Sequence, residues 1–276
     1  MNKFYNMFLL DKLEKPFKRF YPYDRSSFFI KATTIIQILI IKIFNERAYP
    51  QISLVEYFKK NYNLSSDKEF LEKYQKSTEG FDELWQSKPR ETKEQIESFY
   101  EEHDKDVWRQ VYLSKYGRHK KKYVLLIYNL LCDYFKDKKD IKILDYGCGC
   151  GDYSHYFYQK GYKNITLADI NCSTFEFVKK TFGPIFKYIP IDNPGPLKEN
   201  YDAMLLIDCL AHAYNPYESA CYVLDHLNKN GLLIMYYEKG VKGTHLARAW
   251  EQREKTMDYI KSKCRCLKDE EVYIKL

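Results

Sequence analysis

The sequence predicts an α/β fold: a doubly wound, mostly parallel sheet with helices on both faces, preceded by an N-terminal helical domain. From Tyr123 onwards, short apolar runs alternate with segments of helical spacing. Strands separated by helices in this way form parallel sheets. One apolar run ends in a glycine-rich loop, and such sheets bind ligands at the carboxyl ends of their strands. Before residue 93 the apolar spacing is helical throughout, which predicts the additional domain.

The predicted boundary divides the chain into a helical domain, residues 1–92, and a sheet domain, residues 93–276. Within the first, Ser66 and Asp67 are suited to cap a helix that continues to Lys76. The apolar stretch Phe28–Phe44 contains two lysines and is shorter than the roughly 20 uncharged residues of a membrane helix. A buried helix is therefore favoured there, with contact at a membrane surface as the alternative.

The elements of the second domain follow from the spacing of its apolar residues. Helical periodicity first covers Glu91–Tyr116. Helices are then expected over Tyr123–Phe135, Tyr153–Lys160, Phe175–Phe182, Pro216–Leu227 and Thr244–Lys263. Short apolar runs predict strands over Ile141–Leu144, Ile165–Ala168, Phe186–Ile191, Ala203–Ile207, Gly231–Tyr237 and Val272–Leu276. The basic residues between Lys115 and Lys122 are expected to form a solvated helix start.

Charge and cysteine content restrict the partners and the compartment. The 45 lysines and arginines exceed the 38 acidic residues by 7, a modest excess that makes a nucleic-acid partner unlikely. Met1–Phe20 mixes charges among its apolar residues, so no secretory leader is expected, and the eight cysteines are predicted to be reduced thiols in the cytoplasm. The C-x-C pairs Cys148/Cys150 and Cys264/Cys266 do not have the C-x-x-C spacing of zinc sites, so no metal site is expected.

The loop that carries the chemistry is Ile141–Gly151, IKILDYGCGCG. Gly147, Gly149 and Gly151 permit a tight turn and let a ligand approach the backbone closely. Their spacing is G-x-G-x-G, whereas a dinucleotide fingerprint is G-x-G-x-x-G. Asp145 lies two residues before the first glycine, and its carboxylate suits a cationic ligand better than a pyrophosphate.

The string DYGCGCGDYSHYF resembles the first motif, D-x-G-x-G-x-G, of class I (Rossmann-like) S-adenosylmethionine-dependent methyltransferases. It is most similar to the small-molecule branch, which includes quinone-biosynthesis enzymes, and the likeness extends over Phe99–Leu276. The resemblance implies S-adenosyl-L-methionine as cofactor and a sheet of seven strands. One departure from the family is the short region after the fifth strand, KCRCLKDEEVYIKL, which leaves room only for a compact final hairpin.

The resemblance also assigns residues to the cofactor. It implies that Asp145 and the three glycines bind it, that Asp169, followed by Ile170, holds the ribose hydroxyls, and that Asp192 contacts adenine. Tyr100 and Trp108 lie where related enzymes place a lid over the cofactor. An aromatic stripe at helical spacing is also ordinary core, and this alternative stays open.

The same resemblance places His212 and Asp208 after the fourth strand, close to the substrate. We expect His212 to act as a general base and Asp208 to orient the acceptor. The alternatives are a packing role for His212 and a capping role for Asp208.

The sequence thus predicts a biosynthetic enzyme that methylates an N, O, S or C atom of a small molecule or peptide. Asn215-Pro216-Tyr217 weakly resembles an element of nucleic-acid methyltransferases, so an RNA or DNA substrate is an alternative. A non-catalytic cofactor-binding partner subunit is another. The N-terminal domain would serve as a substrate lid or as the arm of a homodimer.

Overall fold

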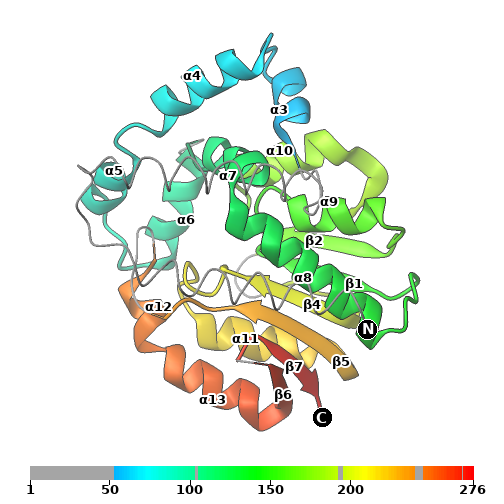
Figure 1. Cartoon of the computed structure of the whole chain (residues 1–276). Helices are drawn as coiled ribbons and strands as arrows, with labels where there is room; N and C mark the ends of the chain where they lie inside the picture. Colours follow the sequence, from blue (N-terminus) through cyan, green and yellow to red (C-terminus); the bar gives the residue numbers. More distant parts are fainter. Residues whose placement is uncertain (1–52, 103–104, 192–194, 240–244, 269) are drawn as a thin grey trace, which may run out of the picture. The chain divides into compact units, whose positions relative to one another are not determined.

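The fold was analysed on a computed structural model that describes residues 53–102, 105–191, 195–239, 245–268 and 270–276 (Figure 1). These residues all belong to one compact unit, Pro50–Leu276. The predicted helix over Phe28–Phe44 and the adenine contact of Asp192 lie outside the described residues. Among the helices that are described, none has the length and apolar character needed to cross a membrane.

A seven-stranded sheet forms the centre of the unit, with the strand order β3-β2-β1-β4-β5-β7-β6. Its strands are β1 (Ile143–Tyr146), β2 (Ile165–Asp169), β3 (Lys187–Pro190), β4 (Tyr201–Ile207), β5 (Leu227–Tyr236), β6 (Cys264–Lys268) and β7 (Val272–Lys275). The first five pair in parallel, and β7 pairs antiparallel with both β5 and β6. The predicted sheet and its C-terminal hairpin are confirmed. The order reverses between β1 and β4, which is where open α/β sheets bind ligands.

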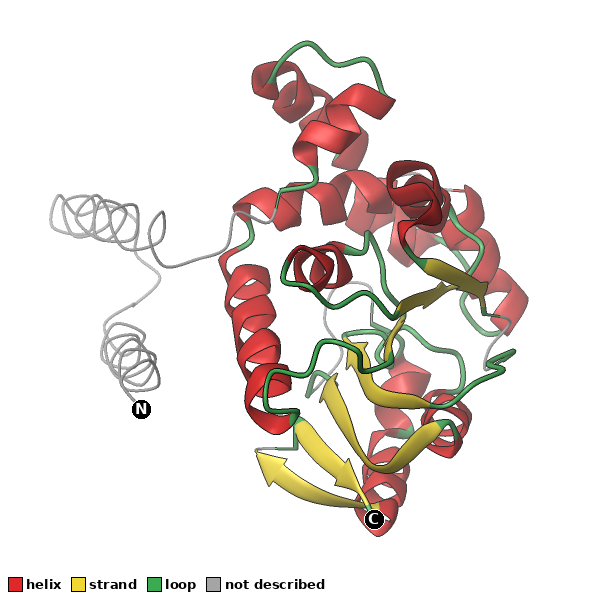
Figure 2. Ribbon diagram, turned by 90° about the vertical axis from the view of Figure 1, so that its right-hand side faces the viewer, coloured by secondary structure: helices red, strands yellow, loops and turns green. Residues whose placement is uncertain are grey.

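The strands bury both of their faces, which explains why they read as continuous apolar runs. Leu205 of β4 packs in one core cluster, and its neighbours Met204 and Leu206 pack in the other. Helices α8 (Arg118–Tyr134), α9 (Asp152–Gln159) and α10 (Ser173–Phe182) contribute to the first cluster. Helices α11 (Pro216–Asp225) and α13 (Arg253–Lys263) contribute to the second, so helices cover both faces (Figure 2).

The long helix predicted over Thr244–Lys263 is instead two helices, α12 (Ala247–Glu251) and α13, separated at Gln252. The two bury residues in different clusters: Ala249 of α12 packs with α5 (Phe81–Ser87) and α6 (Lys93–Glu102), whereas Ile260 of α13 packs under the sheet. The break lets each helix face its own cluster. The periodic segment Glu91–Tyr116 likewise contains two helices, α6 and α7 (Lys105–Tyr116).

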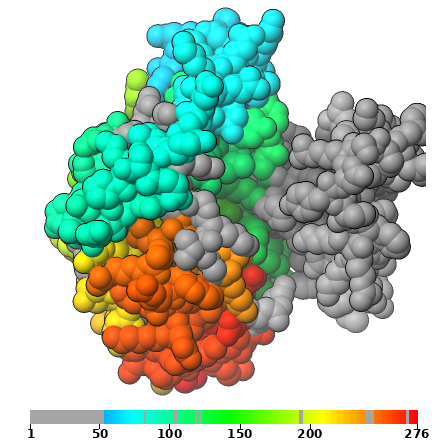
Figure 3. Space-filling view, turned by 90° about the vertical axis from the view of Figure 1, so that its left-hand side faces the viewer, coloured from blue at the N-terminus to red at the C-terminus, as the bar shows by residue number. Residues whose placement is uncertain are grey.

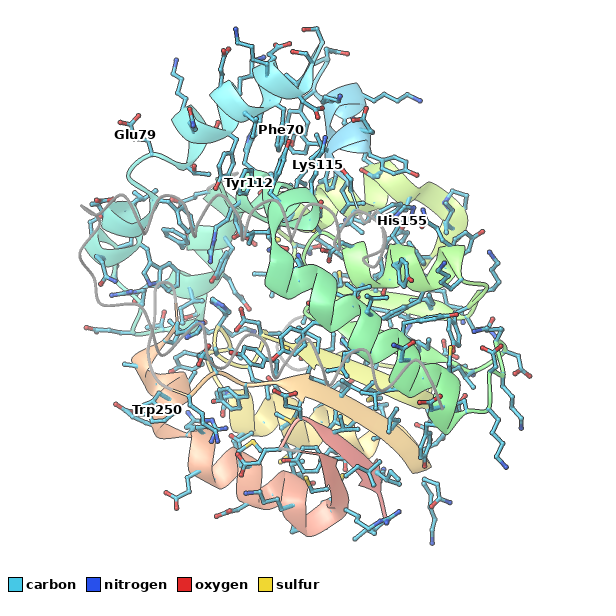
Figure 4. The ribbon with its side chains drawn as sticks, viewed as in Figure 1. Phe70, Glu79, Tyr112, Lys115, His155 and Trp250 are labelled. Atoms are coloured by element: carbon cyan, nitrogen blue, oxygen red, sulfur yellow. The ribbon has the colours of Figure 1, made fainter. Side chains whose placement is uncertain are left out.

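Aromatic side chains join α3 (Val55–Asn61), α4 (Asp67–Thr78) and α7. As predicted, Ser66 caps α4, and its hydroxyl oxygen accepts a hydrogen bond from the backbone N–H of Glu69 at 3.1 Å. The rings of Tyr74 and Tyr112 stack 4.1 Å apart. Figure 4 labels Phe70 on α4 and Tyr112 on α7, whose side chains lie between the two helices.

A smaller apolar cluster joins α5, α6 and α12. Trp85, Phe99 and Ala249 are buried in it, and Tyr100 packs against it. Figure 3 shows the α5–α6 segment (teal) directly beside the α12–α13 segment (orange). Phe99 of α6 and Ala249 of α12, which are 150 residues apart in the sequence, thereby meet in one cluster.

Candidate active site

The glycine loop leaves β1 in backbone conformations that favour glycine. Gly147, Gly149 and Gly151 have φ angles of 71°, 53° and 72°. A Cβ atom on Gly147 would lie 2.3 Å from the Cβ of Cys209, which follows β4. The loop is therefore packed against the end of β4, and the two segments form one site.

Asp169 ends β2 and reaches the same loop. Its carboxylate accepts hydrogen bonds from the backbone N–H of Gly149 at 2.7 Å and from that of Ile170 at 2.8 Å. Burial raises the pKa of Asp169 to about 7, and the two backbone donors only partly oppose this. A carboxylate held in this way can accept hydrogen bonds from two ribose hydroxyls.

Asp145 is buried within β1, with 2% of its surface exposed. Its carboxylate accepts a hydrogen bond from the hydroxyl of Ser154 at 2.7 Å. Burial raises the pKa of Asp145 to about 7, and the nearby carboxylates of Asp152 and Asp169 add to the shift. When ionised, two carboxyl groups beside a glycine cradle suit a ligand that carries positive charge, as the sulfonium and ammonium of S-adenosylmethionine do.

Helix α7 covers the loop with two polar residues that the sequence analysis did not select. The side-chain oxygen of Gln110 accepts a hydrogen bond from the backbone N–H of Cys150 at 2.9 Å. The amide nitrogen of Gln110 donates to Asp106 at 2.6 Å. The two residues are four positions apart, so they lie on one face of a helix, and this spacing is the feature of the sequence that could have identified them. A Cβ on Gly149 would lie 2.1 Å from the Gln110 side-chain oxygen, so Gln110 occupies the space that this glycine leaves open.

Lys120 departs from the solvated helix start expected for its segment. Its ammonium lies 3.0 Å from the carboxylate of Asp152, whose side chain is only 1% exposed. Burial lowers the pKa of Lys120, but the Asp152 carboxylate outweighs this and raises it overall. Asp152 is the first residue of α9, directly after the glycine loop, so the ion pair fixes α8 against the cofactor loop.

At the carboxyl end of β4 the structure brings together Asp208, His212 and Tyr100. The hydroxyl of Tyr100, on α6, lies 3.1 Å from Nδ1 of His212. Burial lowers the pKa of His212, so its imidazole is neutral at pH 7. Asp208 has a φ of 61°, a left-handed conformation that is uncommon for a residue other than glycine and that recurs at functional sites.

His245, which the sequence analysis did not select, joins this cluster. Its Nε2 lies 3.6 Å from the carboxylate of Asp208, and its ring centroid is 5.1 Å from that of His212. The backbone N–H of Leu246 donates to the carbonyl of Ala211 at 2.9 Å and fixes this proximity. No local pattern links positions 212 and 245.

Trp108, a predicted lid residue, packs against aromatic side chains of α3 and α4. Its ring centroid lies 4.5 Å from that of Phe58 and 5.8 Å from that of Phe70. The other predicted lid residue, Tyr100, lies beside His212 instead. Asn215 caps α11, accepting a hydrogen bond from the backbone N–H of Glu218 at 3.5 Å. A helix-capping role thus accounts for the Asn-Pro-Tyr segment.

A family model for a methyltransferase domain matches residues 116–264, more than half of the 276-residue chain. The chain belongs to this methyltransferase domain family. Its fold and its cofactor are those of S-adenosylmethionine-dependent methyltransferases, in agreement with the glycine loop and the two strand-end carboxylates. No curated protein matches the chain at a significant level.

Three solved structures are among those to which the chain is similar. The N-methyltransferase NodS of Bradyrhizobium japonicum WM9 has 13% identity and a TM-score of 0.47, over 66% of this chain and 95% of NodS. The magnesium protoporphyrin IX methyltransferase ChlM of Synechocystis PCC 6803 has 13% identity and a TM-score of 0.46, over 66% and 95%. The amino pentose methyltransferase CalS10 of Micromonospora echinaspora has 14% identity and a TM-score of 0.41, and the match covers 48% of this chain and 56% of CalS10.

Proposed function

We propose that the protein transfers the methyl group of S-adenosylmethionine to a nucleophilic N, O, S or C atom of a small molecule or peptide. The observation that carries this proposal is the contact between the two halves of the site. Gly147 of the cofactor loop lies against Cys209, which adjoins Asp208 and precedes His212 by three residues. A cofactor on the loop and an acceptor beside the polar cluster would therefore be neighbours.

When bound, the cofactor supplies a methyl group already activated by its sulfonium. The protein then has mainly to position and desolvate the reactants. Asp169, Asp145 and the N–H groups of the loop would hold the donor. His212 is neutral, so it can accept a proton from the acceptor, while Tyr100 holds the orientation of its ring through Nδ1. Asp208 would orient a hydroxyl or amine.

Calorimetric titration with S-adenosylmethionine tests the cofactor part of this proposal. We expect micromolar binding by the full chain and a loss of at least about 10- to 100-fold in affinity for Asp169→Ala, because a single hydrogen bond to a carboxylate contributes about 1.5–3 kcal/mol. Asp202→Ala is the matched control, since Asp202 also accepts a backbone N–H, that of Lys142 at 2.9 Å, but lies away from the loop. Equal affinities of the two variants would contradict the proposal.

The pH dependence of this binding is a second readout. Below its pKa of about 7, Asp169 is protonated and loses an acceptor position, so the affinity should fall about tenfold between pH 8 and pH 6. The same titration of Asp169→Asn should be flatter. An equally steep pH profile in this variant would assign the titration to another group.

The division into residues 1–92 and 93–276, and a homodimer formed through the first part, also remain proposals. Trp108 of the second part packs on Phe58 and Phe70 of the first, so deleting residues 1–92 would expose an apolar surface. Light scattering on the full chain is therefore the appropriate measurement. A mass of one chain, about 33 kDa, would refute the dimer.

A further inference from the structure

We propose that Asp208, His212 and His245 bind a divalent transition-metal ion of the Zn²⁺ or Fe²⁺ type. Each of the three offers one ligand atom, and these atoms all lie within 4.8 Å of one another. Two imidazoles and one carboxylate are a donor set that suits such ions better than it suits Mg²⁺ or Ca²⁺, because the latter two prefer oxygen ligands. The set includes none of the cysteines considered in the sequence.

The spacing is compatible with coordination after a small closure. Donors about 2.1 Å from a zinc ion in tetrahedral geometry lie roughly 3.4 Å from one another. Nε2 of His245 and the Asp208 carboxylate are already 3.6 Å apart. Separations of up to 4.8 Å reach this value when the side chains move by about 1 Å.

The surroundings of His212 resemble the outer shell of a metal site. Ligating histidines almost always bond their second ring nitrogen to a neighbouring group, which fixes the tautomer and the ring orientation. Here the Tyr100 hydroxyl lies within hydrogen-bonding distance of Nδ1, at 3.1 Å. Nε2 is then the ring nitrogen left to coordinate a metal ion. The ring of His212 also lies 5.1 Å from that of His245, centroid to centroid, so the two imidazoles are close enough to share one ion.

Three protein ligands leave at least one coordination position open, as in catalytic metal sites. This step rests on the proposed function: the open position would hold a hydroxyl oxygen of the acceptor. The ion lowers the pKa of that hydroxyl, whose proton leaves to solvent. The oxygen forms a bond to the methyl carbon, the sulfur–carbon bond breaks with its electron pair kept by sulfur, and the products are a methyl ether and S-adenosylhomocysteine. With the ion bound, His212 would serve as a ligand in place of the general base of the metal-free site, and the acceptor would be a hydroxyl compound.

The test uses Co²⁺ as a spectroscopic probe, added to the metal-free full chain in the absence of methyl donor. We expect visible absorption of a nitrogen- and oxygen-ligated ion. The dissociation constant should rise at least about 100-fold in Asp208→Ala and in His245→Ala. Tyr100→Phe should weaken Co²⁺ binding by about 10- to 100-fold, as outer-shell substitutions do. His226→Ala is the matched control, because the imidazole of His226 bonds the carbonyl of Tyr222, four residues before it, and is not part of the Asp208–His212–His245 group.

Three outcomes would overturn the metal site: no Co²⁺ spectrum, a spectrum that survives in His245→Ala, or an intense sulfur-to-cobalt charge-transfer band that assigns binding to cysteine. Circular dichroism of each variant separates loss of the site from loss of the fold. Calorimetry with S-adenosylmethionine on the same proteins keeps the two proposals distinct. Asp208→Ala should still bind the cofactor, so a chain that binds cofactor but no Co²⁺ retains the proposed function and loses only the metal.

Discussion

Replacing Gly147 by alanine tests the idea that the cofactor loop and the end of β4 form one packed unit. Gly147 has a φ of 71°, and a Cβ atom there would meet the Cβ of Cys209 at 2.3 Å. The neighbouring atom belongs to the base of a side chain, not to its flexible end. The clash can be relieved only if β1 and the β4 loop move apart.

The expected cost has two parts. A left-handed conformation costs an alanine roughly 1–2 kcal/mol. Forcing an extra carbon into a packed site costs about 1–3 kcal/mol more. Gly147→Ala should therefore lower the free energy of unfolding by about 2–5 kcal/mol. Gly80 is the matched control: its φ is 66°, but the nearest atom to its Cβ would be a flexible Glu83 oxygen at 3.9 Å. Gly80→Ala should show only the first part.

Equilibrium urea denaturation followed by circular dichroism gives both values, and calorimetry gives the affinity for S-adenosylmethionine. Gly147→Ala should weaken the affinity, whereas Gly80→Ala should leave it unchanged. If the two substitutions destabilise the chain equally, within about 0.5 kcal/mol, the packing argument is refuted.

Three further predictions concern the buried charges and the aromatic contact between α7 and α3. Lys120→Met should lower the free energy of unfolding by about 3–5 kcal/mol, because it leaves the Asp152 carboxylate buried without its cation; urea denaturation measures this. The pKa of Asp145 is raised to about 7 in the folded state, so folding favours its protonated form. The free energy of unfolding should therefore fall as the pH rises from about 4 to 7, by at most about 4 kcal/mol. Asp145→Asn should flatten this dependence in thermal unfolding. Trp108→Ala should cost about 3–5 kcal/mol of stability, through lost packing against Phe58.

Each of these has its own control. Adding Asp152→Asn to Lys120→Met should restore part of the lost stability, and no recovery would mean that the ion pair is not the cause. A pH profile of Asp145→Asn as steep as that of the unaltered chain would rule out Asp145 as its source. If Trp108→Ala abolishes cofactor binding while stability is unchanged, Trp108 contacts the cofactor and the packing assignment is wrong.

The sheet could be predicted because its signals are local. Runs such as Ala203–Ile207 are apolar on both faces, and the neighbours Leu205 and Leu206 do pack in opposite clusters. The glycine loop could also be predicted, because each of its three glycines has a positive φ and all three lie within six residues of Asp145. Helix boundaries were less accurate. The helix breaks at Gln252 because α12 and α13 bury their apolar side chains in different clusters. The spacing of apolar residues alone does not predict such a break.

The sequence by itself determined the sheet, its cofactor loop and the carboxylates at the strand ends, because these depend on residue types at fixed short spacings. Tertiary structure alone decided which side chains complete the site. Gln110 reaches the loop because α7 crosses it, and His245 reaches His212 because Leu246 bonds to Ala211. Such contacts join distant segments through packing, and no periodicity along the chain encodes them.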